Sequence, residues 1–154
     1  MRRSLRSELS KLSLLITFAV LTLGALSSVA RAQTPRSVWD GVYTQDQAKQ
    51  GEAVYSESCS SCHGTSLIGQ DAAPALAGGD FLSNWNGLTV GDLFERIRTT
   101  MPQNKAGSLS REKNAAIVAY ILSACQFPAG RSALPQDSDV LKEIRIDASK
   151  PVKK

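Results

Sequence analysis

A chain of 154 residues with a formal net charge of +4 is long enough for one domain and short for two. The excess positive charge lies near the N-terminus, because residues 1–32 contain five of the 18 basic residues and only one of the 14 acidic residues. Residues 33–154 therefore carry 13 residues of each sign. A neutral mature chain gives no support to a nucleic-acid partner or to binding on an anionic membrane surface.

The first 32 residues have the layout of a secretory signal peptide. A basic start that includes Arg2 and Arg3 precedes an uncharged apolar stretch at 12–30, and small residues follow it. The alternative is an uncleaved anchor, and only then would the protein contact a membrane. Because serine, threonine and glycine dilute the stretch, we expect cleavage near residues 30–32 and a periplasmic mature protein.

The composition of the mature chain divides it into three parts. Residues 33–43 are predicted to form an extended lead-in, residues 44–127 the folded domain, and residues 128–154 a polar tail with one apolar patch at 141–146. A domain of this size buries one modest core, to which a large prosthetic group would add.

Three helices are predicted within the domain. The T-x-x-Q sequence that begins at Thr44 fits a capping box, so a helix is expected from there to about Ser58. A short helix that Thr89 can cap follows at about 90–98. The clearest helix spans about 111–124, where apolar residues recur at helical spacing.

Residues 64–87 and 99–109 are rich in residues that interrupt regular structure, and we predict loops there. The sequence shows no repeats and no alternating strand pattern of useful length. The predicted fold class is therefore all-α, with three to four helices and long loops. Loops of this length are poorly supported by their own contacts, so another group is expected to organise residues 64–109.

Cys59, Cys62 and His63 form the C-x-x-C-H pattern of covalent haem attachment. Two thiols three positions apart can each add to one vinyl group of the same porphyrin edge, and the adjacent histidine reaches the iron. The alternatives are a redox dithiol, half of a zinc site, or a structural disulfide. A zinc site needs four ligands, and the mature chain offers only three cysteines and one histidine, of which Cys125 lies far from the others in the sequence. A redox dithiol expects a βαβ setting. We therefore predict one covalently attached haem.

The axial ligands follow from a count. His63 is the only histidine of the chain, so two histidine ligands from one molecule are excluded. Met101 is the only methionine outside the predicted signal peptide and directly precedes Pro102 in a loop, which indicates a thioether as sixth ligand. The alternatives are a methionine that only fills the core, an open sixth position, or a weak ligand such as Lys105 or Asn104.

Together these features resemble the small soluble cytochromes c of bacterial electron transport over about residues 51–127. The resemblance rests on GEAVY before the cysteines, CSSCHG, the loop APALAG, the ligand loop TTMP and the helix AIVAYIL. The run from Phe81 to Pro102 is particularly similar to cytochromes that accompany quinoprotein alcohol dehydrogenases. The resemblance implies a cytochrome c-like fold around one haem c with His63 and Met101 as axial ligands.

The same resemblance implies roles for three further positions. Pro74 matches a loop proline whose carbonyl accepts a hydrogen bond from the proximal histidine, with an ordinary turn proline as the alternative. Trp85 matches an aromatic residue near the haem propionates, with plain core packing as the alternative. Gly51 is expected to meet Tyr120 where the first and last helices cross, unless it is only a weak point in a helix.

Cys125 and the basic residues near Met101 can each be interpreted in two ways. Cys125 is either a small buried hydrophobe or the site of an intermolecular disulfide. Basic residues near the Met101 loop either steer an acidic partner or belong to an ordinary mixed surface. These residues are Arg96, Arg98, Lys105, Arg111 and Lys113.

We expect a periplasmic electron carrier, not an enzyme, that passes single electrons between a dehydrogenase and a respiratory acceptor. Its expected partners are periplasmic or membrane redox proteins, among them a quinoprotein dehydrogenase. The alternatives are a gas sensor or peroxidase-like enzyme with an open sixth site, and an obligate cytochrome subunit of a dehydrogenase. A peroxidase-like site would lack the usual distal acid–base group, because the single histidine is on the proximal side.

Overall fold

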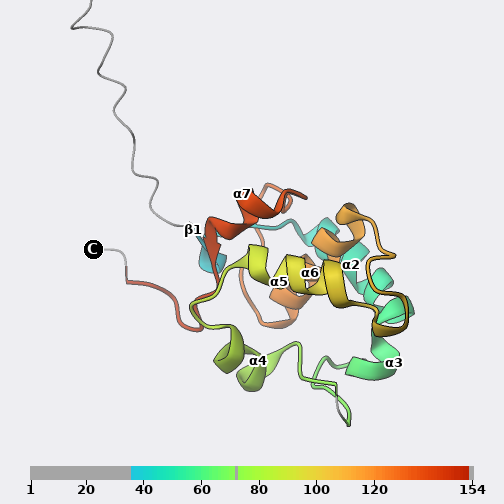
Figure 1. Ribbon diagram of the computed structural model, residues 1–154. Helices are drawn as coiled ribbons and strands as arrows, with labels where there is room; N and C mark the ends of the chain where they lie inside the picture. Colours follow the sequence, from blue (N-terminus) through green and yellow to red (C-terminus); the bar gives the residue numbers. More distant parts are fainter. Residues whose placement is uncertain (1–35, 72, 153–154) are drawn as a thin grey trace, which may run out of the picture. The chain divides into compact units, whose positions relative to one another are not determined.

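Helices α2 (Gln45–Ser58) and α6 (Arg111–Ala124) pack against each other in the computed structural model, which describes residues 36–71 and 73–152 (Figure 1). Thr44 and Ser110 cap the two helices through their side-chain oxygens. Gly51 on α2 faces α6, where an added Cβ would overlap the backbone of Ala116. The expected close crossing of these helices at Gly51 and Tyr120 is therefore present in the structure.

Helix α5 (Val90–Thr100) lies between α6 and the short helix α7 (Ser138–Lys142) and packs against both. Its N-terminus is closed by a complete capping box, in which the Thr89 and Asp92 side chains each accept a hydrogen bond from the other residue's backbone N–H. Its apolar face supplies Leu93, Phe94 and Ile97 to the core, so the helix is amphipathic in the usual sense.

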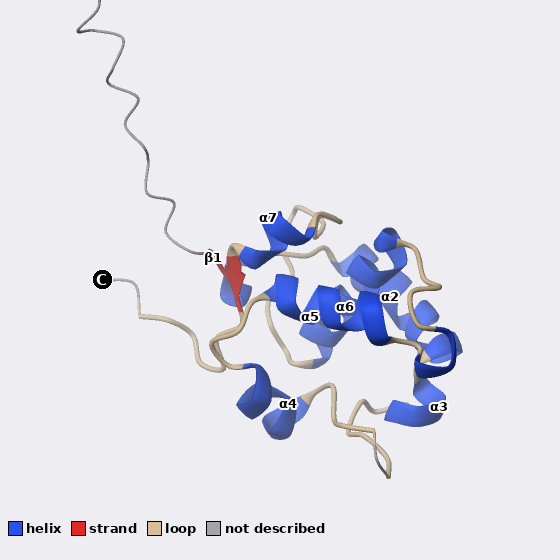
Figure 2. Ribbon diagram, viewed as in Figure 1, coloured by secondary structure: helices blue, strands red, loops and turns tan. Residues whose placement is uncertain are grey.

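Short elements complete the described part of the chain, in which helices dominate (Figure 2). They are the helices α3 (Ser60–His63) and α4 (Gly78–Trp85) and the 3₁₀ helices η1 (Val38–Asp40) and η2 (Gln103–Lys105). The fold class is all-α, as the sequence predicted. Within the described ranges, no helix is both long enough and apolar enough to span a membrane.

The two ends of the described chain meet in a small parallel sheet. Strand β1 (Arg36–Ser37) pairs with β2 (Ile144–Arg145), and Arg36 stands opposite Ile144. The Trp39 indole N–H donates to the Asp147 carbonyl at 2.8 Å, next to the same sheet. Segments separated by about a hundred residues are thus joined.

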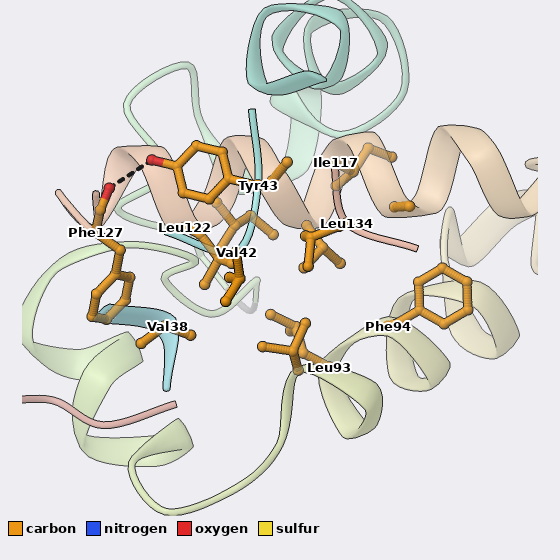
Figure 3. Packing of buried hydrophobic residues seen from close by; sticks show 14 of the residues in the cluster. Val38, Val42, Tyr43, Leu93, Phe94, Ile117, Leu122, Phe127 and Leu134 are labelled. Carbon is orange, nitrogen blue, oxygen red and sulfur yellow. Dashed lines mark hydrogen bonds between the residues drawn. The ribbon is translucent and has the colours of Figure 1, made fainter. Parts of the chain in front are cut away.

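The lead-in and the C-terminal segment both belong to the core, which corrects the prediction for each. Figure 3 shows Val42 from the lead-in and Leu134 from beyond Phe127 lying between Leu93 of α5 and Ile117 of α6. The C-terminal segment, expected to be a polar tail, buries four apolar side chains, namely Leu134, Leu141, Ile144 and Ile146. The part of the lead-in at 36–43 is not simply extended, since η1 occupies its middle.

The predicted helices differ from the observed ones in two further details. Helix α4 lies in a stretch predicted as loop. Its two glycines and its asparagine favoured that prediction, although Phe81 between them is buried. The Thr44 capping box is only half formed. The Gln47 side chain instead makes two hydrogen bonds to the backbone of Leu134, at 2.8 and 3.0 Å. The predicted signal peptide at 1–32 lies outside the described residues.

Candidate functional site

One helical turn carries the two thiols and the imidazole. Helix α2 ends at Ser58, and the Cys59 N–H closes it by donating to the Tyr55 carbonyl at 2.8 Å. The N–H groups of Cys62 and His63 then both donate to the Cys59 carbonyl, at 3.1 and 3.0 Å. Cys59 is half-buried and Cys62 is exposed, and both thiols are free. The turn therefore presents two sulfur atoms beside one histidine.

The His63 ring is fixed by a backbone carbonyl. The side chain is only 7% exposed, and Nδ1 lies 2.9 Å from the Pro74 carbonyl oxygen. Because a carbonyl can only accept, Nδ1 carries the proton of this bond, and in the neutral ring Nε2 is then the atom with the free lone pair. A second-shell carbonyl of this kind holds a ligating imidazole in one orientation and makes it a better donor. The geometry places Pro74 where the resemblance expected it.

The loop between His63 and α4 is held by its own backbone. Leu67 has a left-handed conformation (φ 62°), and its carbonyl accepts from Leu76 at 2.7 Å and from Ala77 at 3.1 Å. The Gly69 N–H donates to the His63 carbonyl at 3.1 Å. A Cβ on Gly69 would lie 2.6 Å from the Ala73 carbonyl oxygen, so only glycine fits this position. These bonds hold the described residues on either side of position 72, and the Pro74 carbonyl reaches His63 from there.

Tyr55 is a site residue that sequence reasoning did not identify. Its hydroxyl donates to the Gly64 carbonyl at 2.6 Å, directly after the turn that carries His63. Burial raises the pKa of Tyr55 to about 12, and nearby Cys59 and Tyr120 add to the effect. The hydroxyl therefore keeps its proton at neutral pH and can donate this bond. The available signal was a tyrosine on the buried face of the helix, four residues before the first cysteine.

The environment of the thiols argues against the redox and zinc interpretations. Burial raises the pKa of Cys59 to about 11, and the neighbouring Cys62 thiol adds to the effect. A reactive dithiol depends instead on a lowered thiol pKa. Within residues 36–71 and 73–152, no group of three or more histidine, cysteine and acidic side chains is placed to hold a metal ion.

Trp85 and Met101 lie at the C-terminal ends of two different helices. Trp85 ends α4 and stacks on Phe81, with ring centroids 6.0 Å apart and an interplanar angle of 26°. Met101 is the C-cap of α5, where its N–H donates to the Ile97 carbonyl at 2.9 Å. Among the described residues, no hydrogen bond or ring contact joins either side chain to His63.

Apolar side chains of these segments remain partly exposed in a way that suits a porphyrin. They come from the Cys59 turn, the following loop, α4, the end of α5 and the loop after it. Each packs against the core yet stays only half-buried, and the set is Cys59, Leu76, Ala77, Leu82, Trp85, Met101 and Leu109. A flat, largely apolar group that covers them would increase their burial. With two thiols and a free Nε2, the donor set fits a c-type haem.

Asn114 forms hydrogen bonds with the end of the loop that follows Met101. Sequence reasoning did not identify it as a site residue. Its fully buried side-chain amide donates to the carbonyls of Leu109 and Ser110, at 3.1 and 2.9 Å. Its Oδ1 atom is buried without a hydrogen-bond partner. A buried asparagine on an otherwise apolar helix face is an unusual choice, and here its two bonds join α6 to the loop that follows Met101.

Cys125 packs half-buried against the core at the end of α6. Burial raises the pKa of this thiol to about 11 from an ordinary value of 9.0, partly offset by a hydrogen bond with the Gly78 backbone. A raised pKa means that the folded state disfavours the thiolate. The resulting stability is present below pH 9 and is lost as the pH rises through 11.

We therefore expect the advantage of the wild type over Cys125→Ser to shrink between pH 8 and pH 11. A two-unit shift corresponds to about 2.7 kcal/mol, and partial exposure of the thiol reduces this to roughly 1 kcal/mol. Urea unfolding of both proteins at the two pH values measures the change. An unchanged difference would mean that the thiol is solvated like that of a surface cysteine.

Comparison with known proteins completes the description of the site. Residues 46–121 match the family described as cytochrome C oxidase, cbb3-type, subunit III. The chain is 34% identical over 94 residues to cytochrome c-554(547) of Halothiobacillus neapolitanus, covering 61% of this chain and 88% of that protein. The solved structure of the sulfane dehydrogenase SoxCD from Paracoccus pantotrophus is similar at 21% identity with a TM-score of 0.45. This match covers 70% of the chain but only 61% of the SoxCD chain, and it is too distant to bear on function.

Proposed function

Because the chain belongs to the cytochrome c family, whose members carry out haem-based electron transfer, we propose that it is a periplasmic carrier of single electrons with His63 and Met101 as axial ligands. The observation that supports this most strongly is the 2.9 Å contact between His63 Nδ1 and the Pro74 carbonyl. It leaves Nε2 as the free donor atom of a histidine that is otherwise buried.

Four residues of the chain have distinct proposed roles in holding the haem. When bound, the haem supplies an iron centre that accepts and releases one electron. Cys59 and Cys62 would anchor it covalently, His63 would ligate from the proximal side, and Met101 would fill the sixth position. A neutral thioether favours ferrous iron and raises the potential, and a filled site resists small ligands. This arrangement suits a carrier better than an enzyme or gas sensor.

Two of the basic residues near the Met101 loop make contacts within the molecule. Arg98 forms a bidentate salt bridge with Glu95, with a closest contact of 2.6 Å. Arg111 donates to the Gln136 carbonyl at 2.7 Å and lies over the Phe94 ring. Two of the five basic residues are thus engaged within the molecule. We propose that apolar contact, more than charge, brings in its partners, a dehydrogenase as donor and a respiratory protein as acceptor.

We expect the purified mature protein to begin near residues 30–33 and to be heavier than its polypeptide by the mass of one haem. Cleavage there follows from the signal-peptide layout, and covalent attachment follows from the paired thiols. Intact-mass spectrometry measures both at once. A retained N-terminus would contradict export with cleavage, and a mass without haem would contradict covalent attachment.

Each thiol of the motif should matter for attachment, and Cys125 should not. Cys59→Ala and Cys62→Ala should each lose covalent haem or most of its yield, because each removes one of two thioether bonds. Cys125→Ser is the matched control, since it removes a third free thiol from the end of α6. Haem staining of denatured protein separates these outcomes. Loss of haem from Cys125→Ser would show that the thiols are wrongly assigned.

A further inference from the structure

The segment 128–148, here called the C-terminal strap, runs from the end of α6 back to the N-terminal strand. Near its start, the Gly130 N–H donates to the Tyr43 carbonyl at 2.7 Å. Gly41 and Gly130 lie very close together. A Cβ added to Gly130 would overlap the Gly41 backbone, and a Cβ added to Gly41 would lie 3.0 Å from the Gly130 Cα atom. The two hydrogen bonds between Gln47 and Leu134 then fix the strap to the first turn of α2.

The middle of the strap presses on α5. A Cβ on Gly91 would lie 2.7 Å from the Ser138 carbonyl oxygen and 2.7 Å from the Lys142 nitrogen, both backbone atoms of α7. Leu141 of α7 is fully buried. Gly91 has no left-handed conformation that would require glycine, so its place within α5 is explained by this contact.

The end of the strap holds the connection between α4 and α5. Residues 86–88 join Trp85, the last residue of α4, to the capping residue of α5. The Gly87 N–H donates to the Ile146 carbonyl at 2.8 Å, and the Ile146 N–H donates to the Leu88 carbonyl at 2.9 Å. The Ala148 N–H donates to Asn86 Oδ1 at 2.8 Å. These three hydrogen bonds therefore fix the connection that leads into α5.

We propose that the C-terminal strap positions Met101, with Gly91 and Asn86 as the positioning residues. Helix α5 is a continuous element that is gripped at its start by the strap and carries Met101 as its C-cap. A shift at the gripped end moves the other end of a rigid helix, and ligand geometry tolerates little displacement. The proposal rests on the proposed function, because it assigns Met101 to the sixth position.

Gly91→Ala tests this proposal. The substitution should favour the helix locally and should disturb the contact between α5 and α7. Alanine is the better helix former, whereas its Cβ would push α7 away from α5. We expect carbon monoxide to bind the reduced variant about tenfold faster than the reduced wild type, because the competent open state is more populated. The reduction potential should fall as well. Hydrogen exchange of the Met101 amide, a readout independent of the haem, should also accelerate.

A second pair of variants keeps the test decisive even if Gly91→Ala fails to fold. Asn86→Ala removes the acceptor of the Ala148 N–H, whereas Asn86→Asp keeps an oxygen there and should behave like the wild type. Gly79→Ala is the matched control for Gly91→Ala, since it lies in α4 with open space around its Cβ position. All rates are measured well below the unfolding temperature of each variant.

The outcomes separate this proposal from the proposed function. Fast carbon monoxide binding in Gly91→Ala or Asn86→Ala, with wild-type rates in both controls, supports positioning by the strap. Folded Gly91→Ala and Asn86→Ala with wild-type rates and potentials would overturn it and leave the strap a purely structural element. A wild type that binds the gas as fast as Met101→Ala would overturn both proposals together, since Met101 would not be a ligand.

Discussion

Met101→Ala should lower the reduction potential by about 0.1–0.2 V, which corresponds to roughly 2–5 kcal/mol for a one-electron couple. The thioether is a soft neutral ligand that stabilises ferrous iron relative to ferric iron, so its loss favours the oxidised state. The change should also open the sixth position, giving high-spin haem that binds carbon monoxide readily when reduced. A redox titration and a carbon monoxide titration of the purified variant measure the two effects.

Met101→Leu separates the sulfur atom from the packing of the side chain. Leucine keeps most of the volume of a residue that packs half-buried against the core at the end of α5. If the thioether ligates iron, the reduction potential of the leucine variant should be nearly as low as that of the alanine variant. The leucine variant should nevertheless unfold at a higher denaturant concentration than the alanine variant. A leucine variant with wild-type potential would show that Met101 only fills the core.

Gly51→Ala should destabilise the protein by at least about 3 kcal/mol, near the upper end of what overpacking costs. The added Cβ would overlap the Ala116 backbone and lie 3.0 Å from Tyr120 Cβ, so α2 and α6 would have to separate. That separation would disturb the Tyr55 and Tyr120 rings, whose centroids are 5.3 Å apart. Urea unfolding of the purified protein gives the loss directly.

Gly79→Ala is the control for this change, because it places the same methyl group in a helix with nothing within 4 Å. There the better helix propensity of alanine should leave stability unchanged or raise it by up to ~1 kcal/mol. Similar stabilities for Gly51→Ala and Gly79→Ala would contradict the close crossing of α2 and α6.

The sequence predicted the parts of the fold whose signals are local. Helix α6 follows from its spacing of apolar residues and from Ser110, and the start of α2 follows from Thr44. Local signals failed where long-range contacts decide the structure. The Gln47 side chain does not complete the capping box, because it forms its hydrogen bonds with the backbone of Leu134. Leu134 lies 87 positions away, and no local pattern identifies it as a partner.

The candidate site was predictable where chemistry requires particular residue types at fixed spacing. The Cys59–His63 turn and the single methionine outside the predicted signal peptide could be predicted from the sequence alone. Tyr55, Asn114 and the C-terminal strap could not, since their roles depend on which carbonyl each donor reaches after folding. The segment 128–148 has the polar composition of an unstructured tail, yet four of its apolar side chains are buried and anchor it to the core.

Exposure of the reduced wild-type protein to carbon monoxide, followed by its visible spectrum, tests the proposed electron carrier most directly. We expect the spectrum of the wild type to change very little, because Met101 would already occupy the sixth position, and we expect rapid binding only after Met101→Ala. Rapid binding by the wild type, with no difference from the variant, would contradict it and would favour a gas sensor or a peroxidase-like enzyme.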